Sequence, residues 1–254
     1  ATIDVSASGD GKGGDVVIFT SQGEFTSSIF ATGTSGGGNI NIYGSGDLML
    51  NSSNWDISTT AGFGGTVLIE AGGNLSVQGD LRAVSQSGSG GVVSLSSQAA
   101  MNVSGIIDVS ATGSGTGGQV YIWSAQQGQL PSTIIATGID GGGRIDIKSG
   151  GDLVVNAKNL NVNTVTGTGG TLSLTAGGEL VVAGTIAALS QNGDGGAILL
   201  SSGGSMSLPS LVNASATAQG TGGSVSITTG GTTINANGAV AVRADGAGTG
   251  SGGS

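Results

Sequence analysis

A unit of about 26 residues recurs along the whole chain, and this repeat constrains the fold more than any other feature. Each unit opens with a glycine pair and continues as alternating apolar and polar residues, as in GKGGDVVIF (11–19), GTGGQVYIW (115–123) and GTGGSVSIT (220–228). One column of apolar residues keeps the spacing with small slips: Ile3, Ile29, Trp55, Leu81, Ile107, Ile134, Leu160, Ile186, Val212 and Val240. Such an array predicts a repeat protein, because one unit alone cannot bury its apolar face.

A longer period lies above the unit. The stretch IDVSA at 3–7 returns at 107–111, and GFGGTVLIEAGGNLSVQGDL at 62–81 returns as GTGGTLSLTAGGELVVAGTI at 167–186. The offset of about 105 residues corresponds to four units. We therefore interpret residues 1–254 as one domain that contains a duplicated four-unit block.

Each unit is predicted to contain three short strands. Examples are Val120/Ile122 for the first strand, Leu75/Val77 for the second and Ile107/Val109 for the third. In each strand the apolar residues alternate with mostly polar ones, so one face is expected to be buried. No segment sustains a period of 3.6 residues, and almost no helix is expected.

Strands this short bury a core only if each unit stacks on the next, with equivalent strands pairing in parallel. The predicted fold is an all-β parallel β-helix, or β-solenoid, with about 26 residues per coil and about ten coils. Its glycines are expected at the corners, where a positive φ or close backbone approach excludes a side chain. Right-handed winding is expected, as for parallel crossovers generally. A propeller blade would need about 40 residues or more.

Composition excludes several other classes of protein. The 54 glycines lack the three-residue period of collagen, and 37% hydrophobic residues are too many for a disordered linker. Only six residues are basic and the net charge is −9, so no nucleic-acid partner is expected. No apolar run approaches the length of a membrane span. The chain has no cysteine, which excludes disulfides and suits export.

The residues give little support for catalysis. Histidine is absent, which removes the commonest general base. Asp4 recurs as Asp108 and Asp47 recurs as Asp152, whereas a catalytic site is normally unique. Aspartates beside glycine are common in turns, and calcium would need six to eight oxygen ligands. We therefore predict no catalytic residue, no metal site and no cofactor.

One face of the first strands is the candidate contact surface. Two outward columns contain its apolar and aromatic members, Val17, Phe19, Tyr43, Leu68, Tyr121 and Trp123. Exposed clusters of this kind often mark a protein contact, and aromatic rings also stack on sugars. Alternatively, flanking loops cover the face or its members are unrelated surface residues. Trp123 and Lys148 are expected to form a cation–π pair, and Trp55 is expected to be buried.

The repeats resemble those of filamentous-haemagglutinin-like exoproteins, as in GTGGTLSLTAGGELVVAGTIAALSQNGDGGAILLSS at 167–202. The resemblance covers nearly the whole chain, although the motifs of the family's N-terminal secretion domain are not recognisable. It implies a right-handed β-helix in a large adhesin exported by two-partner secretion. It also implies a location outside the cell or on its surface, in a Gram-negative bacterium.

Three functions follow as hypotheses. The first is a non-enzymatic shaft of a surface or secreted adhesin or filament, which provides a stiff rod for adhesion, cell–cell contact or extracellular matrix. No cap is evident at either end, so we expect a longer chain or self-association, end to end or lateral. The second hypothesis is accordingly a subunit that assembles end to end into filaments. The third is a β-helix that binds or degrades polysaccharide. Surface glycans and receptors on host or neighbouring cells are the other expected partners.

Overall fold

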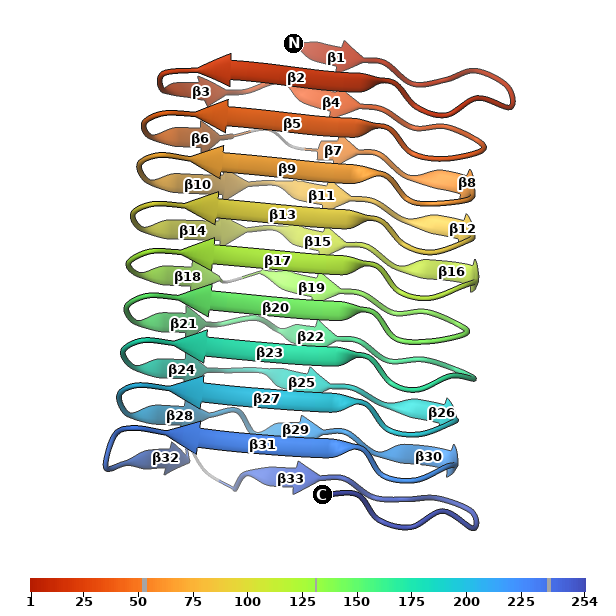
Figure 1. The fold of residues 1–254 in the computed structure, drawn as a ribbon, viewed down its shortest axis with the longest axis vertical. Coiled ribbons are helices and arrows are strands. Elements are labelled where there is room, and N and C mark those ends of the chain that lie inside the picture. The colour runs from red at the N-terminus through yellow and green to blue at the C-terminus, as the bar shows by residue number, and fades with distance from the viewer. Residues whose placement is uncertain (52–53, 131, 237–238) are drawn as a thin grey trace.

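The computed structural model describes residues 1–254 except 52–53, 131 and 237–238. Its described part contains strands and no helix, and the chain winds as a parallel β-solenoid of nine turns (Figure 1). The near strands run from right to left and the far strands from left to right while the chain descends, which is a right-handed winding. The predicted fold class is confirmed. One turn fewer is present than expected, because β1 precedes the first complete turn.

The longest strands form the first sheet, which faces the viewer in Figure 1. Its nine members are paired in parallel, each with six residues. They are β2 (Asp15–Thr20), β5 (Asn39–Gly44), β9 (Thr66–Ala71), β13 (Val92–Ser97), β17 (Gln119–Ser124), β20 (Arg144–Ser149), β23 (Thr171–Ala176), β27 (Ala197–Ser202) and β31 (Ser224–Thr229).

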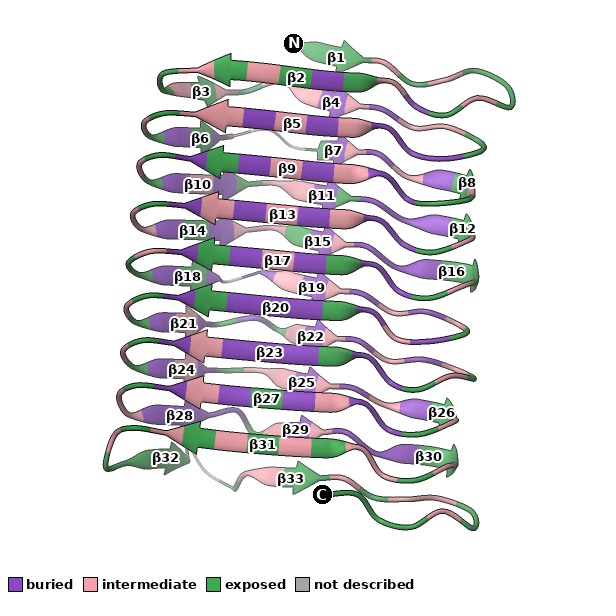
Figure 2. Cartoon of the chain, viewed as in Figure 1, coloured by how far each residue is buried: buried purple, intermediate pink, exposed green. Residues whose placement is uncertain are grey.

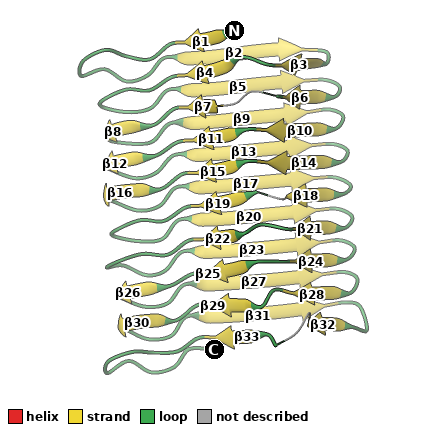
Figure 3. Ribbon diagram, turned by 180° about the vertical axis from the view of Figure 1, so that it is seen from behind, coloured by secondary structure: helices red, strands yellow, loops and turns green. Residues whose placement is uncertain are grey.

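Two sheets of shorter strands lie behind the first sheet, as the reverse view in Figure 3 shows. The second sheet contains β3 (Gly23–Phe25), β6 (Leu48–Leu50), β10 (Leu75–Gln78), β14 (Met101–Ser104), β18 (Gly128–Leu130), β21 (Leu153–Val155), β24 (Leu180–Val182), β28 (Met206–Leu208) and β32 (Ile234–Ala236). The third contains β1 (Thr2–Asp4), β4 (Ser28–Phe30), β7 (Asn54–Asp56), β11 (Asp80–Arg82), β15 (Ile106–Asp108), β19 (Thr133–Ile135), β22 (Asn159–Asn161), β25 (Thr185–Ala187), β29 (Leu211–Asn213) and β33 (Ala241–Arg243).

Some turns also contain a fourth strand, which the sequence did not predict. These strands are β8 (Thr59–Ala61), β12 (Ser85–Ser87), β16 (Ala111–Ser114), β26 (Ser190–Asn192) and β30 (Ala216–Gln219). Their inward residues include Thr59, Ser85 and Ser190, which are buried although polar. The Ser85 hydroxyl donates to the Gly62 carbonyl at 2.8 Å, and Ser190 donates to Gly167 at 2.6 Å. A search for alternating apolar residues therefore does not detect them.

The core is a continuous column of inward side chains from all three sheets, buried in most turns (Figure 2). Trp55 is 0% exposed, as predicted, and stacks between Ile29 and Leu81. Its indole Nε1 donates to the Ser27 carbonyl at 3.2 Å, which satisfies the buried polar atom. The column was misassigned only in the last turn, where Val212 pairs with Val242 and not with Val240. That turn is longer, with 30 residues from Val212 to Val242.

The glycine pairs mark the corners where the chain enters the first sheet. A Cβ on Gly90 would lie 1.7 Å from the Val109 carbonyl oxygen of the next turn, so backbone contact excludes any side chain there. The amide of Gly91 donates to the Ala83 carbonyl at 2.8 Å and closes its own turn. Among the pairs, Gly65 also has a positive φ of 81°. Close backbone approach is therefore the main reason for glycine at these corners.

Candidate functional site

The candidate contact surface lies on the outward face of the first sheet. Val17 and Phe19 are on β2, Tyr43 is on β5, Leu68 is on β9, and Tyr121 and Trp123 are on β17. The observed strand register is the predicted one: Phe19 pairs with Tyr43, Ser96 pairs with Trp123, and Ser94 pairs with Leu68 and Tyr121. These residues point outward because their neighbours along each strand, such as Val16 and Ile122, point into the core.

We group four of these residues as an apolar cluster, which comprises Val17, Phe19, Tyr43 and Leu68, with Asn41 on β5 between Val17 and Leu68. Phe19 is 77% exposed and Val17 is 52% exposed. The Phe19 and Tyr43 rings are stacked, with centroids 5.2 Å apart and planes inclined by 16°. Tyr43 and Leu68 are half-buried. A stacked pair with most of one ring in solvent gives a preformed apolar contact area.

The remaining two residues belong to an aromatic–ionic cluster, which comprises Tyr121, Trp123, Arg144, Asp146 and Lys148. The Arg144 guanidinium carbon lies 5.8 Å from the centre of the Tyr121 ring. One Asp146 oxygen, Oδ2, accepts from Arg144 at 2.8 Å and lies 3.9 Å from the Lys148 Nζ. The pKa of Arg144 is raised above its ordinary value, mainly because the guanidinium donates a hydrogen bond to Asp146.

The predicted cation–π pair between Trp123 and Lys148 is wrong. Trp123 and Lys148 are cross-strand partners, but within the described residues the cation–π contact joins Arg144 and Tyr121. Asp146 lies between the two basic residues on β20 and orients the planar guanidinium. Trp123 is 39% exposed.

The two clusters are separate. Glu70 on β9 is exposed beside Tyr43, and β13 contributes only Ser94 and Ser96 to the outward columns between β9 and β17. One turn of small hydroxyl side chains therefore interrupts the apolar surface. The face brings the six predicted residues onto one sheet but not into one patch.

The recurring aspartates accept hydrogen bonds from backbone amides. Asp4, Asp56 and Asp108 each accept a hydrogen bond from the amide two residues later, at 2.9, 2.9 and 3.1 Å. Asp47 and Asp152 instead reach the next turn, where they accept from the amides of Asn74 at 2.7 Å and Glu179 at 2.8 Å. Their recurrence therefore reflects repeated turn geometry, which supports the interpretation made from the sequence.

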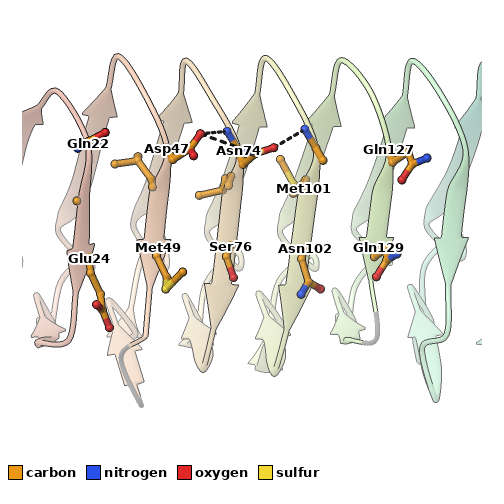
Figure 4. A pocket seen from close by; sticks show the side chains of 14 residues that line it. Gln22, Glu24, Asp47, Met49, Asn74, Ser76, Met101, Asn102, Gln127 and Gln129 are labelled. Atoms are coloured by element: carbon orange, nitrogen blue, oxygen red, sulfur yellow. Dashed lines mark hydrogen bonds between the residues drawn. The ribbon is translucent and has the colours of Figure 1, made fainter.

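A groove on the second sheet was missed by the sequence analysis. It has a volume of about 620 Å³ and crosses β3, β6, β10, β14 and β18. Figure 4 shows its side chains in two rows that run across the strands, from one turn to the next. One row contains Glu24, Met49, Ser76, Asn102 and Gln129, and the other contains Gln22, Asp47, Asn74 and Gln127.

Eight of the fourteen lining residues are polar and none is basic, while Leu48, Met49, Leu75, Ala100 and Met101 contribute much of the lining surface. The sequence contained a signal for it, because the first row is the outward column of the predicted second strands. Amides and hydroxyls, however, lack the apolar character that marks a protein contact face in a sequence.

No cluster of three or more histidine, cysteine, aspartate or glutamate side chains that could hold a metal occurs among the residues that the structure places. Across the same residues, no helix is long and apolar enough to cross a membrane. Asp146 Oδ1 is buried without a hydrogen-bond partner, although Oδ2 of the same carboxylate has two basic neighbours.

Comparison with known proteins gives no further identification: no protein family, curated protein or solved structure matches this chain.

Proposed function

We propose that this chain is a section of a stiff, non-catalytic shaft in a bacterial surface or secreted protein of the filamentous-haemagglutinin-like class. The observation that carries the proposal is the uninterrupted parallel pairing of all three sheets through nine turns. At about 4.8 Å per turn, β2 and β31 lie roughly 38 Å apart. The described turns share the three main strands and differ in their loops and in the presence of a fourth strand, so the repeats provide length and rigidity.

The proposal places the shaft outside the cell, where contacts are made through its sides. The apolar cluster on the first sheet is the contact area we assign to lateral association with a second rod. Its stacked pair at Phe19 and Tyr43 is preformed, and Val17 adds an exposed aliphatic group. Binding energy at such contacts concentrates in aromatic residues that become buried.

The second candidate is a filament subunit. It is favoured by the parallel pairing of equivalent strands from turn to turn, because the same pairing can continue from one copy to the next.

Electron microscopy of the native material, together with the mass of the intact polypeptide, tests both proposals. A single chain much heavier than the 24.0 kDa of these residues, seen as an isolated rod, is expected for a shaft. Long fibres built from chains near that mass would establish the filament subunit instead. Isolated compact particles with no rod would contradict both.

The lateral contact is tested by Phe19→Ser in the native protein. Loss of the stacked ring is expected to weaken rod–rod association about tenfold or more in analytical ultracentrifugation. Phe63→Ser is the matched control, because Phe63 is an exposed phenylalanine outside the cluster. Equal rod–rod association in both variants would show that Phe19 does not contribute to the lateral contact.

A further inference from the structure

The groove on the second sheet contains several polar side chains that form no hydrogen bond with other described residues of the protein. Within the described part of the chain, the side chains of Gln22, Ser76, Asn102, Gln127 and Gln129 make no hydrogen bond, whereas Asp47, Asn74 and Glu24 do. Four of these five residues are exposed, and Ser76 is half-buried. Each amide offers two donors and an acceptor that point into the groove or along its rim (Figure 4).

The floor beneath these groups is rigid. Leu48, Leu75 and Met101 are buried below the rows, and their strands pair in parallel register. Asp47 Oδ1 accepts from the backbone and the side chain of Asn74, and Asn74 Oδ1 accepts from the Ala100 amide at 3.2 Å. Asp47 and Asn74 are therefore held in place before a ligand arrives, which lowers the entropic cost of binding at these two residues.

The arrangement is linear and periodic. The five strands are about 4.8 Å apart, so the groove extends for about 19 Å parallel to the axis of the rod. Each strand contributes one residue to the first row, and the residue before each strand contributes to the second, so side chains recur at nearly equal intervals. These side chains are polar except at Met49 and Ala100. A ligand that fits this pattern is itself an extended polymer whose units each carry several hydroxyl groups.

The charge of the groove selects among such polymers. Glu24 and Asp47 are its only ionisable lining residues, and no lysine or arginine lines it. A polymer with carboxylates or sulfates would be repelled and would find no cationic partner. The Met49 thioether, with 43% of the residue exposed, provides an apolar surface against the face of a sugar ring.

We propose that this groove binds a neutral, hydroxyl-rich linear polysaccharide that lies parallel to the rod axis. The strands β3, β6, β10, β14 and β18 each contact successive sugar units, and the amides of Asn102, Gln127 and Gln129 supply most of the directional hydrogen bonds. The site is separate from both clusters on the first sheet.

The experiment is calorimetric titration of the native protein with soluble neutral linear oligosaccharides of increasing length, in α- and β-linked series. Affinity is expected to rise with length and to level off once the ligand spans the groove. A polyuronate of matching length is expected to bind at least about tenfold more weakly. Absence of binding by every neutral series, or stronger binding of the polyuronate, would overturn the proposal.

Two variants locate the site. Asn102→Ala is expected to weaken binding about three- to tenfold, as for the loss of one or two hydrogen bonds. Ser76→Trp fills the centre of the groove and is expected to abolish binding. The controls are Gln191→Ala, an exposed residue on β26, and Val181→Trp, in the same outward column beyond the groove.

Unchanged thermal unfolding of all four variants is expected, since each altered side chain faces outward. If Ser76→Trp retained binding, or if Val181→Trp lost it equally, the ligand would be shown not to bind in this groove. Failure of the glycan titration would leave the shaft proposal intact, because that proposal is judged by rod dimensions and polypeptide mass.

Discussion

Ile122 illustrates how a single residue supports the solenoid. Its side chain is 3% exposed and lies in the inward column between Leu95 and Ile147. Ile122→Asp places a carboxylate between apolar neighbours on both sides, where it finds no partner. The expected loss in the free energy of unfolding is several kcal/mol.

Urea denaturation followed by circular dichroism measures this loss. Thr228→Asp is the control, because Thr228 is exposed on the outward face of β31 and its substitution is expected to cost little. Equal denaturation midpoints for Ile122→Asp and the parent chain would contradict the buried position of Ile122.

Asp194 links stability to pH. Its carboxylate accepts from the Thr221 hydroxyl at 2.7 Å and the Thr221 amide at 2.8 Å, and these hydrogen bonds hold the Asp194 pKa below its ordinary value of 3.8. Because the pKa of Asp194 is lower in the folded protein than in the unfolded chain, the ionised carboxylate stabilises the fold. This stabilisation is fully present at pH values above 3.8 and is lost as the pH falls through the pKa of the folded state. Lowering the pH from about 5 to about 2 is therefore expected to lower the urea midpoint.

Asp194→Asn tests the origin of this effect. The variant is expected to be less stable at neutral pH and to lose less stability on acidification, because it has no carboxyl group to protonate at this position. A midpoint that falls with pH as steeply in Asp194→Asn as in the parent chain would assign the acid sensitivity to other carboxyl groups.

At the scale of the element, the glycines differ in whether their positions have space for a side chain. Gly90 has no room for a Cβ, which would lie 1.7 Å from the Val109 carbonyl oxygen. Gly23 on β3 has room, because the nearest atom to its Cβ would be the Thr20 hydroxyl oxygen at 3.7 Å. Gly90→Ala is expected to destabilise the protein by about 1–3 kcal/mol or more. Gly23→Ala is expected to be neutral or stabilising by about 0.5–1 kcal/mol.

Thermal unfolding of both variants checks the distinction. The pair controls for composition, since each change adds one methyl group to a glycine. A similar loss of stability at both positions would show that backbone freedom, and not the space at the corner, determines where glycine is needed.

At the scale of the whole molecule, the turns are interchangeable units. Thr66 pairs with Val92, so deletion of residues 66–91 removes 26 residues and brings β13 onto β5 in register. The shortened chain is expected to fold cooperatively, because each turn contacts only its neighbours. Small-angle X-ray scattering should show a rod shorter by about 4.8 Å.

Deletion of residues 66–78 is the control, since it removes half a turn and places the third-sheet residues of β11 against first-sheet strands. It is expected to lose the cooperative transition. Comparable folding of both deletions would contradict the register-dependent stacking of turns.

The amino-acid sequence alone predicted the repeat, the columns of inward residues, and the residues that lie beside Phe19, Tyr43 and Trp123 on the outward face. It could do so because strand alternation has a period of two and parallel stacking preserves register, so a column in the sequence is a column in space. Burial of Trp55 followed from the same alignment.

Tertiary structure alone decided which side chains meet. The fourth strands are held by serine and threonine hydroxyls that bond carbonyls of distant residues, and no apolar pattern marks them. Arg144 contacts Tyr121 because Asp146 orients the guanidinium, a choice that depends on side-chain geometry and not on spacing. The groove lies across five short strands whose outward side chains are aligned, and the hollow between those side chains depends on their three-dimensional arrangement, which one-dimensional periodicity does not encode.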